Sequence, residues 1–177
     1  MTVICAMRDE ARGVTILGCN SRSLVGSVVL PADRSKWHVF GHWACGLTGA
    51  GVTTDAVLAR RDRFPHDTDD AFAVATFIRK CLTKLELGEE EDGARDYDIS
   101  GLLVHRSGRL FDMDANLSLE EMNEGAFWAS GSGGRVALGA SHALGPEVGP
   151  EARVRRCVEA AIALDSGCPG TPMIETF

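Results

Sequence analysis

Five histidines and six cysteines carry the side chains of this chain that most readily bind metals or act as nucleophiles. His38 and His42 are four residues apart, which on a helix would place both imidazoles on one face, as in many zinc sites. The segment 37–43 is typical of a strand, however, and on a strand residues i and i+4 lie ~13 Å apart. We therefore expect no metal and no cofactor.

The cysteines are widely spaced and form no C-x-x-C pair, so neither a zinc site nor a disulfide framework is indicated. They occupy positions 5, 19, 45, 81, 157 and 168. A Cys–His nucleophilic pair would need a recognisable motif, and none is present. Buried free thiols are the expected state.

The segment Gly131-Ser132-Gly133-Gly134 could cradle a phosphate at a helix start. Neither G-x-G-x-x-G nor the lysine of a P-loop accompanies it. A nucleotide site is therefore not favoured.

Length and charge limit the remaining classes of function. The 177 residues suffice for one domain, 1–177, and are too few for two ordinary ones. The net charge of -7 and the scattered 18 basic residues argue against nucleic-acid binding. The start lacks a secretory signal and no apolar run is long enough to span a membrane, so we expect a cytoplasmic protein.

Strand-like and helix-like segments alternate in runs. Strands are expected at 3–7, 14–17, 27–30, 37–45, 99–105, 109–113, 127–129 and 172–177, with a flexible loop at 46–51. Helices are expected at 53–63, 70–87, 136–144 and 151–165, with Asp67 and Thr68 as candidate caps of the second. The acidic run 89–93 is expected to be a solvated loop.

Runs of strands followed by runs of helices favour antiparallel sheets with helices on the outer faces. The leading architecture is an α+β fold, a four-layer αββα sandwich of two antiparallel sheets flanked by helices. Periodicity alone leaves other α+β folds open.

Five local matches, in order along the chain, give it a resemblance to the proteasome β-subunit and HslV-type peptidase family of N-terminal-nucleophile hydrolases. The matching segments are Thr2 directly after Met1, Gly18-Cys19-Asn20-Ser21-Arg22, Ser35-Lys36, Gly46-Leu47-Thr48-Gly49, and Phe127 to Gly134 leading into the helix at 136–144. Residues 165–171 also resemble the family's turn after its last long helix, although Pro169 is unexpected there.

The resemblance implies that Thr2 is the catalytic nucleophile of a threonine peptidase. A threonine hydroxyl needs a base, and an N-terminal threonine carries one in its own α-amine, whose ordinary pKa is ~8. Thr2 can act only once Met1 is removed, and methionine aminopeptidase tolerates a small residue at this position. No propeptide is then required.

The same resemblance implies roles for five further residues. Lys36 would act electrostatically beside the nucleophile, and Gly49 would donate a backbone N–H to the oxyanion, with Ala50 or Gly51 as substitutes. A third group would hydrogen-bond the threonine amine and orient that network: Ser132, Gly133 and Asp165.

Asn20 is the main departure from the family, which has an aspartate there to pair with the lysine. An asparagine keeps hydrogen bonds but loses the charge, so a buried Lys36 would be less compensated. Asp33 is a possible substitute.

Three functions follow as hypotheses. The first is a self-compartmentalising threonine endopeptidase that cleaves polypeptides inside a homo-oligomeric ring, with a possible ATP-dependent unfoldase as partner. The second is a catalytically weak or inactive ring or scaffold subunit, motivated by Asn20. The third is an amidase acting on small molecules.

Overall fold

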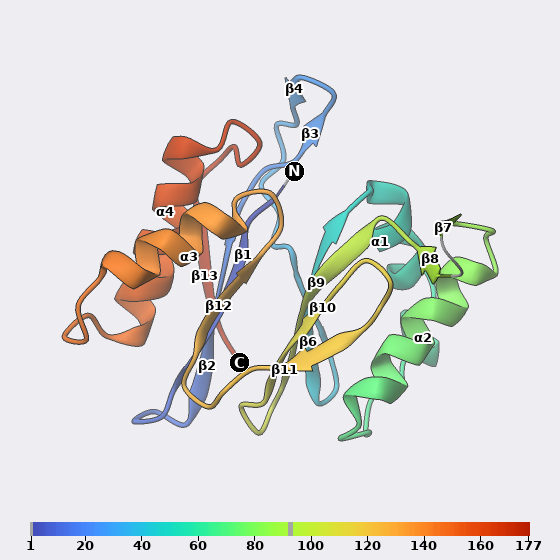
Figure 1. The fold of residues 1–177 in the computed structure, drawn as a ribbon, viewed down its shortest axis with the longest axis horizontal. Coiled ribbons are helices and arrows are strands. Elements are labelled where there is room, and N and C mark those ends of the chain that lie inside the picture. The colour runs from blue at the N-terminus through green and yellow to red at the C-terminus, as the bar shows by residue number, and fades with distance from the viewer. Residues whose placement is uncertain (1, 92–93) are drawn as a thin grey trace.

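The computed structural model describes residues 2–91 and 94–177, and two antiparallel sheets form its centre (Figure 1). The first sheet has the order β12-β1-β2-β13. Its strands are β1 (Ile4–Asp9), β2 (Val14–Asn20), β12 (Phe127–Ser130) and β13 (Pro172–Thr176). The second sheet has the order β11-β10-β9-β6-β5. Its strands are β5 (Trp37–Phe40), β6 (Trp43–Gly49), β9 (Ile99–His105), β10 (Leu110–Met113) and β11 (Leu119–Glu121).

The described residues form four α-helices, which cover the outer faces of the two sheets (Figure 1). They are α1 (Gly51–Leu58), α2 (Ala71–Thr83), α3 (Gly134–Ala143) and α4 (Pro150–Leu164). The first two pack on the second sheet, and the last two pack on the first. Apolar residues of both sheets, Ile4 and Leu17 against Leu102 and Val104, fill the layer between them. The predicted four-layer αββα sandwich is confirmed.

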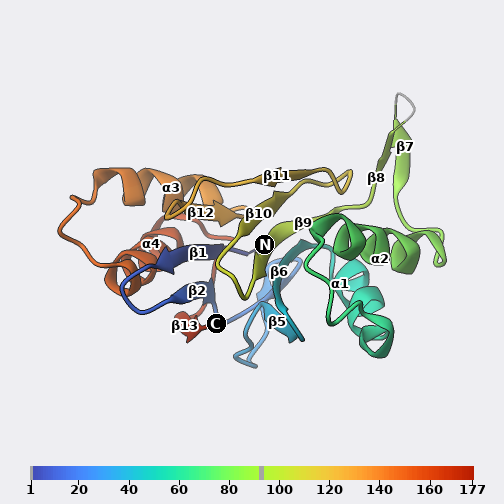
Figure 2. The ribbon, with the colours of Figure 1, turned by 90° about the horizontal axis from the view of Figure 1, so that it is seen from below.

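Two small ribbons extend from this body. One pairs β3 (Leu24–Val25) with β4 (Val28–Val29), so the strand expected at 27–30 is shorter than predicted. The other pairs β7 (Glu89–Glu91) with β8 (Ala94–Asp96) and points away from the sheets (Figure 2). The acidic run predicted as a loop therefore begins in a strand, and its last two positions, 92–93, lie outside the described residues.

The single strand predicted over 37–45 is wrong, because the chain turns at Gly41. The φ of Gly41 is +57°, and the backbone N–H of His42 donates to the carbonyl of His66 at 3.0 Å. His38 and His42 therefore do not share a strand. A side chain at 41 would place its Cβ 2.3 Å from the His66 carbonyl oxygen, so only glycine permits this approach.

The loop predicted over 46–51 is also wrong. Residues 46–49 continue β6 and pair with β9, and Gly51 begins α1. The two strands lie so close that a Cβ on Gly101 would come within 2.0 Å of the Gly46 carbonyl oxygen. Glycines that indicate a loop in the sequence serve here for close strand packing.

The predicted helices are present, but their ends differ from the predicted ones. The helix expected at 53–63 is divided into α1 and a 3₁₀ turn at Arg61–Arg63, and the one expected at 70–87 ends at Thr83. Its N-cap is Asp70, whose carboxylate accepts the N–H of Phe72 at 2.9 Å, and not Asp67 or Thr68. Among the described residues, no helix combines the length and apolarity needed to cross a bilayer.

Candidate active site

Thr2 lies two residues before the start of β1 and is only 9% exposed. The loop between β12 and α3 closes over it. The backbone nitrogen of Thr2 donates to Ser132 Oγ at 3.3 Å, and the N–H of Gly133 donates to the Thr2 carbonyl at 3.3 Å. The structure therefore brings both residues beside Thr2, with Ser132 on the nitrogen, as expected from the resemblance, and Gly133 on the carbonyl instead.

Gly131 permits this contact. Its φ is +90°, and a Cβ there would lie 2.2 Å from the Thr2 carbonyl oxygen and 3.2 Å from Thr48 Cγ2. The loop thus joins the start of β1, in the first sheet, to the end of β6, in the second. Any side chain at 131 would separate them.

Asp165 follows α4 and contacts the site through Cys168 and through Ser132. Its Oδ1 accepts the N–H of Gly167 at 2.8 Å, and Cys168 Sγ donates to its Oδ2 at 3.4 Å. The Cys168 sulfur lies 3.8 Å from Ser132 Oγ, which completes a chain from the Thr2 nitrogen to Asp165.

The protonation states in this chain are set by burial and by hydrogen bonds. The N–H of Gly167 lowers the pKa of Asp165, so the carboxylate is ionised at neutral pH. Burial raises the pKa of Cys168 to about 11, so the thiol stays neutral and can donate. Cys168 was missed in the sequence. Its position three residues after Asp165 in a tight turn is the signal that could have found it.

Lys36 is buried, and its ammonium group donates hydrogen bonds to uncharged oxygen atoms. Nζ donates to the Arg22 carbonyl at 3.2 Å and to Ser23 Oγ. Among the salt bridges found in residues 2–91 and 94–177, none involves Lys36. Burial lowers the pKa of Lys36, because the charged form is desolvated without a carboxylate beside it.

Asn20 is fully buried, and both the oxygen and the nitrogen of its side-chain amide make hydrogen bonds. Oδ1 accepts the N–H of Val3 at 3.0 Å, while Nδ2 donates to the carbonyls of Arg22 at 2.8 Å and Pro169 at 3.0 Å. Only an NH₂ group can satisfy two carbonyls at once, which defines the amide orientation. Asn20 and Lys36 therefore meet indirectly, on the shared Arg22 carbonyl.

Asp33 does not replace the missing carboxylate. Its Oδ1 accepts from Ser21 Oγ at 2.6 Å and pairs with Arg22 Nε at 3.1 Å. The hydrogen bond from Ser21, followed by that from Arg22, lowers the pKa of Asp33. The structure therefore does not place Asp33 beside Lys36 in the role of the family's aspartate, which the sequence left open.

Gly49 ends β6 with a φ of +116°. It lines a pocket of about 580 Å³ together with Thr53, Asp98 and Ser100. The N–H of Ala50 donates to the Asp98 carbonyl at 3.1 Å, so it is already engaged, which argues against Ala50 as the oxyanion donor. Thr48, the residue before Gly49, lies beside Gly131 in the loop between β12 and α3 that contacts Thr2.

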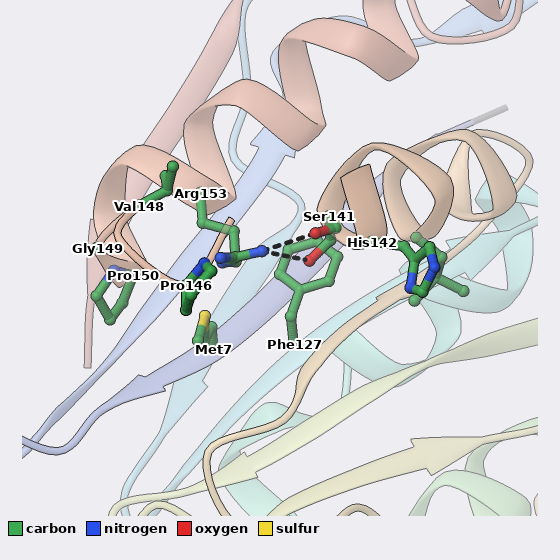
Figure 3. Close-up of a pocket in the computed structure, with 10 residues that line it drawn as sticks. Met7, Phe127, Ser141, His142, Pro146, Val148, Gly149, Pro150 and Arg153 are labelled. Carbon is green, nitrogen blue, oxygen red and sulfur yellow. Dashed lines mark hydrogen bonds between the residues drawn. The ribbon is translucent and has the colours of Figure 1, made fainter. Parts of the chain in front are cut away.

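A second pocket, of about 550 Å³, lies at the other end of β1 around Met7, Phe127 and Arg153 (Figure 3). Met7 lies five positions after Thr2 along extended chain, or roughly 16 Å away. Arg153 donates to the carbonyls of Ser141 at 2.7 Å and Gly145 at 2.6 Å, so it caps the C-terminal end of α3. This pocket contains no predicted site residue.

Solved structures with this fold cover the whole chain. The structure described as Thiobacillus denitrificans BPH matches with a TM-score of 0.79 and 21% identity, over 99% of this chain and 97% of that one. The same protein in complex with epoxomicin matches with a TM-score of 0.79 and 20% identity, over 99% and 98%. Eukaryotic HslV from Trypanosoma brucei matches with a TM-score of 0.70 and 15% identity, over 99% and 98%.

No protein-family model matches the chain, and no curated protein matches it in sequence. At these identities the structural likeness shows the fold, which is HslV-like and proteasome-like. The activity has to be argued from the residues.

Proposed function

We propose that the chain is a threonine peptidase that uses Thr2, exposed by removal of Met1, as its nucleophile. The observation that carries the proposal is the hydrogen-bonded chain behind the Thr2 nitrogen. Ser132 accepts from that nitrogen, and Cys168 links Ser132 to the ionised Asp165. An α-amine held in this way is positioned to exchange protons.

The reaction then follows from elementary chemistry. The neutral amine takes the proton of the Thr2 hydroxyl, and the oxygen attacks the peptide carbonyl to form a tetrahedral oxyanion. The N–H of Gly49 is the proposed donor to that oxyanion. The amine passes the proton to the leaving nitrogen, the C–N bond breaks, and water hydrolyses the resulting ester.

Lys36 supports this chemistry through its charge. A positive group near the nucleophile favours a neutral amine and a developing alkoxide. The Lys36 Nζ donates to uncharged oxygens, and the pKa of Lys36 is lowered by burial. A growing fraction of Lys36 therefore loses its charge as the pH rises toward that pKa. Activity that depends on the Lys36 charge would therefore fall at high pH.

Polypeptides are the proposed substrates, and a cytoplasmic homo-oligomeric ring is the proposed assembly, with an unfoldase as a possible partner. The likeness to HslV supports a ring, and the epoxomicin complex of the Thiobacillus protein supports threonine chemistry, because epoxomicin is a proteasome inhibitor. Light scattering on the purified protein and hydrolysis of casein against small amides would test assembly and substrate class.

The direct test of the nucleophile is the intact mass of the protein before and after incubation with epoxomicin. A species lacking Met1 that gains one inhibitor mass, and a Thr2→Ala variant that gains none, are the expected results. Retention of Met1, or adduct in both proteins, would overturn the proposal.

A catalytically weak or inactive ring subunit is the second candidate. The observation that favours it is the absence of a carboxylate on Lys36 among the described residues, where Asn20 and the Arg22 carbonyl stand instead. Absence of adduct in a correctly processed and folded protein would favour this function. Adduct formation with hydrolysis of small amides alone would favour the third hypothesis, an amidase.

A further inference from the structure

Two histidines and an aspartate from three separate segments meet at the end of the second sheet opposite Gly49. His42 lies in the turn between β5 and β6, Asp69 in the loop before α2, and His105 at the end of β9. One donor atom of each lies within 4.8 Å of the other two. No local pattern in the sequence marks this cluster, because the three segments are far apart along the chain.

The separations match those of ligands that share one ion. Asp69 Oδ1 lies 3.3 Å from His42 Nδ1 and 3.0 Å from His105 Nε2. Tetrahedral Zn²⁺ with bonds of about 2.0–2.1 Å places its ligand atoms roughly 3.3 Å from one another. A small movement of these side chains would let one ion replace the two hydrogen bonds.

The backbone holds His42 in place before any ion binds. Its N–H donates to the His66 carbonyl at 3.0 Å, and its carbonyl accepts the N–H of Arg106 at 2.9 Å. Gly41 permits the first of these contacts, as described above. A ligand held by its own backbone loses little conformational freedom on binding.

The His105 ring is held by packing and by a hydrogen bond on its other nitrogen. The residue is 5% exposed, and its ring centroid lies 4.9 Å from that of Trp43. Its Nδ1 lies 2.8 Å from Ser107 Oγ and accepts the backbone N–H of Ser107 at 3.3 Å. An ion on Nε2 requires the tautomer with the proton on Nδ1, which would then donate to Ser107 Oγ and orient the ring, at the loss of the bond from the Ser107 N–H.

Asp69 leaves the cluster open on one side. Its side chain is 74% exposed, so an ion has a route in and a water molecule can supply a further ligand. Arg109 lies nearby and donates to the Asp69 carbonyl at 3.3 Å, while Glu121 holds its guanidinium at 2.7 Å. Its charge is therefore partly compensated.

We propose that His42, Asp69 and His105 bind one divalent transition-metal ion, with Zn²⁺ as the best fit to two imidazole nitrogens and one carboxylate oxygen. The ion ties the β5–β6 turn to the loop before α2 and to the end of β9. Gly49 lies seven positions after His42 along extended chain, or roughly 23 Å away, so the ion takes no part in chemistry at Thr2. The site is therefore independent of the proposed peptidase activity.

The test is calorimetric titration of the chelator-treated full chain with ZnCl₂, with thermal unfolding and metal analysis alongside. One Zn²⁺ per chain and a rise in Tm are expected. His42→Gln, Asp69→Asn and His105→Gln should each weaken binding by more than about 100-fold, since loss of a ligand's hydrogen-bond partner alone costs 10- to 100-fold. Ser107→Ala should cost about 10-fold.

Matched controls are His38→Gln and His142→Gln, two histidines outside the cluster, which should bind Zn²⁺ as the unchanged chain does. Asp69→Asn alters an exposed side chain and should fold, so the test stands even if His105→Gln does not. No Zn²⁺ binding, or equal binding by Asp69→Asn and the control variants, would overturn the proposal. So would Mg²⁺ or Ca²⁺ binding as tightly as Zn²⁺, because those ions prefer oxygen ligands.

Discussion

Replacement of Asn20 by aspartate tests whether this residue is a damaged catalytic aspartate or a structural amide. The variant would keep the bond from the Val3 N–H but lose the two that the amide donates to the Arg22 and Pro169 carbonyls. Each lost bond costs about 1 kcal/mol, and a buried carboxylate facing unpaired carbonyls adds to this. We expect Asn20→Asp to lose about 3 kcal/mol of unfolding free energy at pH 7.

The loss of unfolding free energy in Asn20→Asp should depend on pH in a definite direction. Burial against two carbonyls raises the folded-state pKa of the new carboxyl above its unfolded value of ~3.9, so the native state binds more protons than the unfolded state between the two values. The stability deficit should therefore be smallest near pH 4, where the neutral acid can donate one hydrogen bond, and should grow as pH rises through the folded-state pKa.

Urea unfolding followed by tryptophan fluorescence, at matched protein concentration and several pH values, measures this deficit. Asn20→Ala is the control, because it removes all three bonds without adding charge, and its deficit should not change with pH in this way. A deficit below about 0.5 kcal/mol for Asn20→Asp at pH 7, against the cost expected for two buried hydrogen bonds, would refute the reasoning. Faster labelling by epoxomicin at the same time would show that the carboxylate pairs with Lys36.

Four further outcomes are expected. Cys168→Ser should keep epoxomicin labelling within a few-fold, whereas Cys168→Val should slow it by about 10- to 100-fold in timed mass spectra, because the link to Asp165 is lost. Gly131→Ala should lower Tm in calorimetry and slow labelling, because its Cβ would meet the Thr2 carbonyl. Arg153→Met should cost about 2–4 kcal/mol in urea unfolding by leaving the α3 carbonyls unpaired, while the labelling rate stays unchanged. The lowered pKa of Lys36 should make the free energy of unfolding rise with pH, since the unfolded chain then binds more protons than the folded chain. Lys36→Met should remove this rise in urea titrations.

The fold was largely predictable because hydrophobic patterns report burial. Strands and helices at 99–105, 109–113 and 151–165 were found within a residue or so. The errors fall where long-range packing decides. Gly46 and Gly101 lie in strands because the backbones approach closely there, and Gly41 makes a turn against His66 that no local pattern marks.

The candidate site was predictable only through resemblance, because its members are distant in sequence. Thr2, Lys36 and Ser132 carry no local signal that unites them. The partners of Asn20 could not be foreseen, since two of its three bonds go to backbone carbonyls whose directions depend on the folded chain. Cys168 was set aside as one buried thiol among six, and only its place between Ser132 and Asp165 distinguishes it.

The chain order of the site has a consequence for biosynthesis. Thr2 leaves the ribosome long before Asp165, Cys168 and Pro169, which complete its surroundings. The final strand, β13, pairs with β2 beside them. A nascent chain would thus carry the proposed nucleophile without the groups proposed to activate it, and newly made neighbours would be protected from cleavage until residues 165–176 had been synthesised and had folded.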